Sequence, residues 1–227
     1  MNKPVNVAID CDGCITDMHI SNKPLVIIVE GVDRTGKSTF IEKLRNKATT
    51  HKIVHLHSVK PPQLKWSPYN NVNGEKSREW SYNYNMQTMA NVNELIKDND
   101  IIILDRSYIG EYVYGDLYRN AKYRNASLGE FEDRVSSTYP LLKIEDFVLV
   151  YLTDSVENIL AREDGKSHTN DAEYKLRELR KFKEAVSNSK IENKVYINWA
   201  KTPFTDNTFD KYINYILSDY DKQYIGK

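Results

Sequence analysis

Residues 25–40 have the sequence LVIIVEGVDRTGKSTF, and three features of this stretch indicate the class of fold. The apolar run Leu25–Glu30 is short for a helix and suits a strand that is buried on both faces. The spacing Gly31-x-x-x-x-Gly36-Lys37-Ser38 comes next, and an amphipathic pattern typical of a helix covers Ser38–Lys47. A strand, a glycine-rich turn and a helix in this order predict a phosphate-binding loop, or P-loop.

The residue types in this loop suit a nucleotide that carries several phosphates. Gly31 and Gly36 allow backbone conformations that a side chain would obstruct, so successive N–H groups can converge on phosphate oxygens. Lys37 adds a positive charge between the β- and γ-phosphates, and the Ser38 hydroxyl can coordinate Mg²⁺.

Short apolar runs alternate with longer amphipathic stretches along the rest of the chain. Strands are expected at Val5–Asp10, Leu25–Glu30, Lys52–His57, Asp100–Leu104, Phe147–Leu152 and Lys194–Asn198. Helices are expected at Ser38–Lys47, Trp80–Lys97, Ser155–Arg162, Asp171–Ser187 and Asp210–Asp221. Two polar stretches, 61–76 and 165–170, are either functional loops or plain surface connections. The alternation predicts an α/β fold with a mainly parallel, doubly wound sheet.

Length and composition limit the class of protein. The 227 residues suit one large domain, which we place at 25–227, with an N-terminal extension at 1–24. The 32 Lys and Arg residues balance the 32 Asp and Glu residues, so overall charge does not favour long nucleic acid or a membrane as partner. The sequence shows no signal peptide, no apolar run near about 18 residues, and only two cysteines. These features predict a soluble cytoplasmic protein.

A second motif follows the run Asp100–Leu104. Asp105 leaves the carboxyl end of that run, at the edge where doubly wound sheets bind ligands, and can organise a metal ion there. Arg106 offers two parallel N–H donors that suit a second phosphate, the one carried by an acceptor. The alternative is an ordinary surface Asp–Arg pair.

Together these motifs resemble those of the thymidylate kinases. Residues 30–39, EGVDRTGKST, look like the P-loop of that family, and Asp105-Arg106-Ser107 is similar to its Asp-Arg-Tyr element. A looser resemblance covers about residues 25–220. It implies a P-loop kinase fold with a five-stranded parallel sheet flanked by helices, here with an N-terminal strand or hairpin added. It also implies ATP as phosphoryl donor, Mg²⁺ and a homodimer.

The resemblance also implies roles for single residues. Asp33 matches the residue that contacts the sugar 3′-hydroxyl of the acceptor, Arg34 the one that supports the transferred phosphoryl group, and Arg106 the one that holds the acceptor phosphate. Arg162 lies near the family's lid arginine, and Ala200 lies in its adenine-contacting loop. The expected catalytic residues are Arg34, Lys37, Asp105, Arg106 and Arg162. The expected ATP-binding residues are Gly31, Asp33, Thr35, Gly36, Lys37, Ser38, Thr39 and Ala200, with Ser38 and Asp105 on the metal.

The segment that reads the acceptor base departs from the family pattern. The family's arginine falls near Asn85 here, so Asn85 and Gln87 are candidates for the base edge, since an amide offers both a donor and an acceptor. Tyr82 or Trp80 is the candidate stacking platform, and the alternative is that these aromatics are helix core. The departure leaves dTMP, dUMP or a modified analogue open as the acceptor. The heavy use of Lys, Asn, Tyr and Ile, with this departure, indicates a viral or other AT-rich source, and a viral source would place the protein in a host cytoplasm.

The N-terminal extension carries two further patterns. Residues 7–17, VAIDCDGCITD, look like motif I of haloacid-dehalogenase-type phosphatases, with Asp10 as nucleophile and Asp12 as acid–base partner. Because the segment is too short for a phosphatase domain, an added strand or hairpin is the favoured interpretation. The cysteines Cys11 and Cys14 are either free thiols or, with His55 and His57, a zinc site.

The sequence as a whole predicts a nucleoside monophosphate kinase that acts on a deoxypyrimidine monophosphate. One alternative is a deoxynucleoside kinase, which needs a general base near the end of the second strand, where residues 55–60, HLHSVK, contain no carboxylate. A polynucleotide 5′-kinase and a non-catalytic nucleotide-binding regulator are the others.

Overall fold

The computed structural model describes residues 24–58, 75–118, 126–162, 165 and 169–224. Their strands are β1 (Leu25–Glu30), β2 (Ile53–His57), β3 (Ile101–Asp105), β4 (Val148–Thr153) and β5 (Asn193–Asn198). The helices are α1 (Lys37–Lys47), α2 (Glu75–Leu95), α3 (Tyr108–Tyr118), α4 (Leu128–Thr138), α5 (Val156–Ala161), α6 (Ala172–Asn188) and α7 (Asp206–Tyr224). A single 3₁₀ turn, η3 (Ile144–Asp146), precedes β4.

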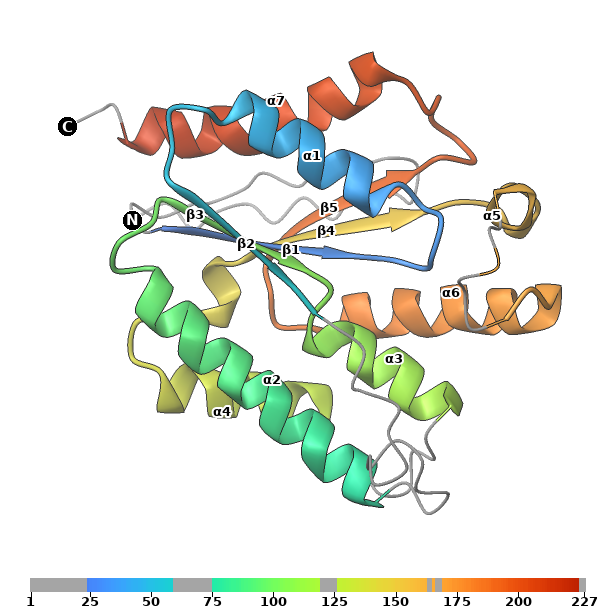
Figure 1. Cartoon of the computed structure of the whole chain (residues 1–227), viewed down its shortest axis with the longest axis horizontal. Coiled ribbons are helices and arrows are strands. Elements are labelled where there is room, and N and C mark those ends of the chain that lie inside the picture. The colour runs from blue at the N-terminus through green and yellow to red at the C-terminus, as the bar shows by residue number, and fades with distance from the viewer. Residues whose placement is uncertain (1–23, 59–74, 119–125, 163–164, 166–168, 225–227) are drawn as a thin grey trace, which may run out of the picture.

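The five strands form one parallel sheet in the order β2-β3-β1-β4-β5 (Figure 1). Its central strand is β1, which is buried along its whole length. The register aligns Val29 of β1 with Asp105 of β3, and Asp105 in turn with His57 of β2. Because all strands run the same way, the residues that follow them gather at one carboxyl edge of the sheet.

Helices cover both faces of the sheet, which explains why the central strands β1, β3 and β4 lack an apolar–polar alternation. Alternate residues such as Ile27 and Val29 pack under α1 and α7, while their neighbours Val26 and Ile28 pack against α2, α3, α4 and α6 (Figure 1). Each face therefore has its own apolar core. This is the α/β, doubly wound architecture that the alternation of runs predicts.

Two helices in the structure have no counterpart in the sequence-based prediction. Helix α3 is apolar around most of its surface, contains two glycines and is largely buried, so it shows no amphipathic period. Helix α4 begins with a capping box in which Ser127 and Glu130 bond each other's backbone N–H groups, a local signal that identifies a helix start. Helix α2 also begins at Glu75, so the loop predicted for 61–76 is wrong at its last two residues.

Several predicted features lie outside the described residues. They are the strand at Val5–Asp10, the extension up to residue 23, the loop from 61 to 74 and part of the polar stretch 165–170. Among the described parts of the chain, no helix is long and apolar enough to cross a membrane.

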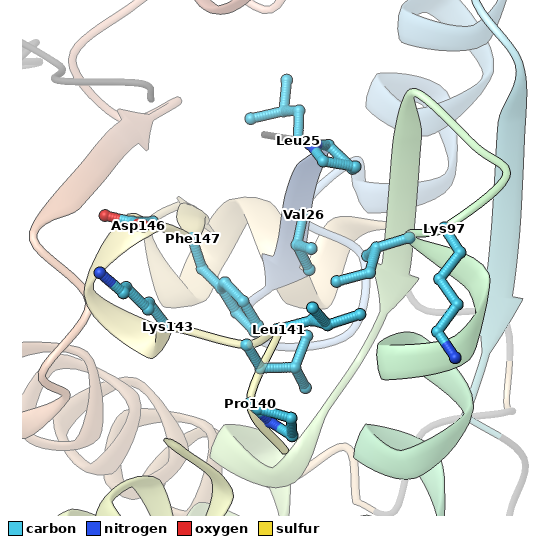
Figure 2. A pocket seen from close by; sticks show the side chains of 11 residues that line it. Leu25, Val26, Lys97, Pro140, Leu141, Lys143, Asp146 and Phe147 are labelled. Atoms are coloured by element: carbon cyan, nitrogen blue, oxygen red, sulfur yellow. The ribbon is translucent and has the colours of Figure 1, made fainter. Parts of the chain in front are cut away.

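The two edges of the sheet differ in chemistry. At the amino edge, Leu25 and Val26 border an apolar pocket of about 330 Å³ that also includes Lys97, Leu141 and Phe147 (Figure 2). At the carboxyl edge, the P-loop between β1 and α1 lies beside the ends of β2 and β3. The polar residues that the sequence analysis identified lie mainly at this second edge.

Candidate active site

A cavity of about 460 Å³ opens at the carboxyl edge of the sheet. Its lining brings together most of the residues predicted for phosphate binding: Asp33, Arg34, Gly36, Lys37, Ser38, Thr39, His57, Asp105, Arg106, Arg162 and Phe204. The P-loop, the end of β3 and the end of α5 each contribute an arginine or a lysine. The cavity is therefore a cationic site built from segments that are far apart in the sequence.

The P-loop wraps around the Lys37 ammonium group. Lys37 Nζ donates hydrogen bonds to the carbonyls of Gly31 and Val32, both at 2.8 Å. Burial, together with repulsion from the Arg106 guanidinium, lowers the pKa of Lys37 to about 8. Lys37 is thus held in place and remains largely charged at neutral pH.

Two contacts fix the loop against the rest of the sheet. The Gly31 backbone has a φ of +146°, and a Cβ atom at this position would lie 2.1 Å from the Leu152 carbonyl oxygen. On the other side, Trp199 Nε1 donates a 2.7 Å hydrogen bond to the Thr35 carbonyl. The P-loop therefore depends on β4 and on the segment after β5 for its position.

Both arginines next to the phosphate-binding groups have left-handed backbone. Among the residues that the structure describes, Arg34 and Arg106 are the two non-glycine residues with positive φ, at 71° and 68°. Such a conformation costs about 1–3 kcal/mol and is typical of functional sites. Both side chains line the same cavity.

Arg106 faces the P-loop, as the acceptor-phosphate interpretation requires. Its guanidinium pairs with the carboxylate of Asp33, in the middle of the loop. Burial alone would raise the pKa of Asp33, but the charges of Arg106 and Lys37 outweigh it and the pKa is lowered. Asp33 is therefore an anion that orients Arg106.

The Arg106 backbone is anchored by Glu30, for which the sequence predicted no role. Glu30 Oε1 accepts hydrogen bonds from Ser107 N–H at 2.7 Å, from Ser107 Oγ–H at 2.9 Å and from Gly110 N–H at 3.1 Å. Burial raises the pKa of Glu30, although these donors oppose the rise. A side chain at the end of β1 thus fixes the start of α3 and the strained residue before it.

Asp105 lies at the end of β3 and is buried. Its Oδ2 lies 2.7 Å from Nδ1 of His57, the neighbouring residue on β2. Burial lowers the pKa of the nearby His55, and the positive charge of Arg45 adds to this. Asp105 and the exposed Ser38 both line the cavity and both offer the oxygen ligands that Mg²⁺ prefers, so this pair fits the predicted metal.

Arg162 is held by neighbours on its own side of the cavity. Its guanidinium pairs with Asp154, a buried carboxylate that follows β4, and its Nε donates to the Asn158 carbonyl at 3.0 Å. It also lies over the Phe204 ring, with 5.5 Å between the guanidinium carbon and the ring centroid. The predicted lid arginine thus lines the cavity next to an exposed aromatic ring.

The residues predicted to bind the base are not brought to this cavity. The Asn85 amide is buried and donates to the Ser81 carbonyl of its own helix, and Gln87 is exposed and bonds Asn91. Tyr82 packs edge-on against Phe131. Trp80 stacks on Tyr84, and the exposed Ala200, which was predicted to contact adenine, is not among the residues that line the cavity.

Sequence reasoning missed Phe204, which lines the cavity itself, and three residues that support the site, Glu30, Asp154 and Trp199. Each of these three acts through a contact with a segment that is distant in sequence or through a buried carboxylate with no motif around it. The phosphatase-like Asp10 and Asp12, and the cysteines Cys11 and Cys14, lie outside the described residues.

No protein-family model and no curated protein matches the sequence. Solved structures are nevertheless similar over most of the chain. Thymidylate kinase from Candida albicans is 16% identical with a TM-score of 0.54, and the match covers 87% of this chain and 94% of that one. The YorR protein from Bacillus subtilis, in complex with phosphorylated GDP, is 18% identical with a TM-score of 0.53, covering 85% and 95%.

A third similar structure is deoxyadenosine kinase from M. mycoides with bound dATP. It is 15% identical with a TM-score of 0.51, and the match covers 85% of this chain and 99% of that one. With the parallel sheet and the P-loop at its carboxyl edge, these similarities show that the chain has the α/β P-loop kinase fold. The predicted fold class is confirmed.

Proposed function

We propose that the protein is a nucleoside monophosphate kinase that moves the γ-phosphoryl group of ATP to a deoxypyrimidine monophosphate. The observation that carries the proposal is the Arg106–Asp33 pair, which sets a second phosphate-directed cation across the same cavity from Lys37. Plain nucleotide binding does not need two strained arginines in addition to the P-loop. The names of the similar structures, thymidylate kinase among them, support a kinase of this kind.

The cavity suits phosphoryl transfer between two phosphates. Lys37 and the P-loop N–H groups would bind the tail of ATP, and Arg106 would hold the acceptor phosphate with its forked donors. An acceptor phosphate oxygen forms the new bond to the γ-phosphorus while the bond to the ADP oxygen breaks, so no separate base is needed. Mg²⁺ bound near Ser38 and Asp105 would neutralise charge on the phosphates.

Adenine has a candidate platform in the same cavity, beside the P-loop. Arg162 and the exposed Phe204 lie together there, and a guanidinium plane and an aromatic ring both stack on nucleobases. Because Asp154 holds the Arg162 guanidinium, we propose that Arg162 orients ATP chiefly through stacking. The acceptor, by contrast, stays defined only as a deoxypyrimidine monophosphate: dTMP, dUMP or an analogue.

The test is a panel of acceptors with ATP and Mg²⁺, with release of ADP as the readout. We expect turnover with one or more deoxypyrimidine monophosphates and at least about tenfold slower turnover in Lys37→Ala and in Arg106→Ala. Unchanged rates in both variants would contradict the site assignment. ATP binding without turnover on any acceptor would favour the nucleotide-binding regulator.

One observation favours a hydroxyl acceptor as the second candidate. The sequence offered no carboxylate at the end of β2, but His57 lies there with its Nδ1 against Asp105, which is the arrangement of a general base with its orienting carboxylate. A deoxyadenosine kinase is also among the similar structures. Deoxynucleosides therefore belong in the panel, and turnover on them that His57→Gln removes would support this candidate instead.

A further inference from the structure

We infer that His55, His57 and Asp105 form a binding site for a first-row transition-metal ion such as Zn²⁺ or Co²⁺. Each of the three residues offers one ligand atom, and these atoms all lie within 4.8 Å of one another. His55 Nε2 is 3.7 Å from Asp105 Oδ2, and His57 Nδ1 is 2.7 Å from the same oxygen. The site shares Asp105 with the Mg²⁺ position of the proposed kinase, so the experiment below is done without nucleotide and with Mg²⁺ in excess to separate the two ions.

The sheet itself brings these ligands together. His55 and His57 are two residues apart on β2, so their side chains leave the same face of the strand. The parallel register sets Asp105 beside His57, which turns a pattern of two histidines into a cluster of three ligands. The cluster is open to solvent at His57, whose side chain is 55% exposed.

One of the three groups has an unsatisfied polar atom. His55 Nε2 is buried and has no hydrogen-bond partner among the described residues, since 3.7 Å to Asp105 is too long for a hydrogen bond. A buried ring nitrogen without a partner carries a free-energy cost that a bound ion would remove. The same ion would take the place of the proton in the hydrogen bond between His57 Nδ1 and Asp105 Oδ2.

The donor set selects against Mg²⁺ and in favour of a softer ion. Mg²⁺ takes oxygen ligands, whereas imidazole nitrogens suit zinc, cobalt, copper and nickel. Two imidazoles and one carboxylate supply three of the four positions of a tetrahedral site. Because His57 and Asp105 also line the phosphate cavity, the fourth position faces that cavity, where a water molecule or a phosphate oxygen can bind.

The experiment titrates the full chain with Co²⁺ in the presence of excess Mg²⁺ and without nucleotide. We expect the visible absorption bands of tetrahedral Co²⁺, and we expect Zn²⁺ to abolish them. His55→Gln, His57→Gln and Asp105→Asn should each weaken Co²⁺ binding about tenfold or more, since even outer-shell changes cost that much. Circular dichroism of each variant confirms that it is folded.

Two control variants separate this site from others. His51→Gln makes the same change in a histidine that packs against Tyr220, and it should leave Co²⁺ binding unchanged. The double variant Cys11→Ser, Cys14→Ser should also keep the bands. Loss of the bands in the cysteine variant would overturn the inference, as would bands that persist in both His55→Gln and His57→Gln or a wild-type protein that shows none.

For a histidine variant that does not fold, the wild-type protein supplies a second measurement. Paramagnetic Co²⁺ should shift the imidazole proton signals of His55 and His57 and leave those of His51 in place. Shifts confined to other histidines would overturn the inference without any variant.

Discussion

The backbone of this site is strained at two residues, Arg34 and Arg106, which both have a left-handed conformation. A left-handed conformation at a residue with a side chain is maintained only where the surroundings determine it. At Arg106 the surroundings are hydrogen bonds: its own N–H donates to the Val29 carbonyl at 3.1 Å, and Glu30 accepts from Ser107 and Gly110 just after it. The result is two cations directed at one cavity.

Among the glycines that the structure describes, Gly31 has the least room for a side chain. Gly31→Ala would place a Cβ atom 2.1 Å from the Leu152 carbonyl oxygen, a backbone atom that cannot move alone. We expect a loss of about 1–3 kcal/mol in the free energy of unfolding, measured by urea denaturation, together with weaker ATP binding. Gly129→Ala is the matched control, since its Cβ would meet only the Lys190 side chain at 3.6 Å. An equal loss in both variants would contradict the argument.

From the lowered pKa of Lys37 we expect ATP binding to depend on pH. Its pKa of about 8 means that the free protein loses this positive charge as the pH rises above 8. Bound phosphates favour the charged form, so ATP affinity should fall above pH 8 by up to about tenfold per pH unit. Isothermal titration calorimetry would measure the fall.

Lys37→Arg is the control for this dependence, because arginine keeps its charge over the whole range. Its ATP affinity, even if weaker, should not change between about pH 7 and pH 9. A fall of the same size in the Lys37→Arg variant would assign the pH dependence to another group.

The sequence alone identified the site residues that belong to a short motif. Lys37, Ser38, Asp105 and Arg106 belong to short patterns whose chemistry follows from spacing alone, and all four line the cavity. Glu30 and Trp199 could not be found in this way. Their partners, Ser107 and Thr35, are 77 and 164 residues away in the chain and meet them only in the folded sheet.

Strand β5 and the segment after it support the P-loop through one side chain. Trp199 is buried against Phe204 and Phe209, and its indole N–H donates to the Thr35 carbonyl. Trp199→Phe keeps an aromatic ring but leaves that buried carbonyl without this donor. We expect a loss of about 1–3 kcal/mol in unfolding free energy and weaker ATP binding.

The same substitution elsewhere tests whether the hydrogen bond is responsible. Trp80→Phe on α2 changes a tryptophan that stacks on Tyr84, away from the P-loop. Its ATP affinity, measured by the same calorimetry, should equal that of the wild type. If Trp199→Phe also binds ATP normally, the indole contact does not position the loop.

A helix or strand could be predicted from the sequence where its residues show a helical period of apolar residues or a short apolar run. All five described strands fall within about one residue of the apolar runs, and the signal is clearest for β1, β3 and β4, whose runs are buried on both faces. Helix α3 lacks such a signal, since it is packed on several sides and its apolar residues have no preferred face. Its existence depends on the tertiary structure.

At the level of the whole molecule, the described residues from 25 onward contain a five-stranded sheet with two covered faces. The division into an extension at 1–24 and a domain at 25–227 stays a prediction, and so does the homodimer, which sedimentation analysis would test. The apolar pocket beside Leu25 and Leu141 lies next to the point where the extension joins β1 (Figure 2). A variant that lacks the extension therefore also tests whether the extension covers this pocket.

Deletion of residues 1–23 should leave the fold and ATP binding intact. Both apolar cores and all the residues that line the cavity belong to the part of the chain that remains, so no described core contact is lost. We expect the urea midpoint and the calorimetric ATP affinity of the shortened chain to match those of the full chain. A lower midpoint, together with stronger binding of a dye that reports exposed apolar surface, would show that the extension stabilises the domain. Normal stability with lost ATP binding would instead give the extension a role at the opposite, carboxyl edge.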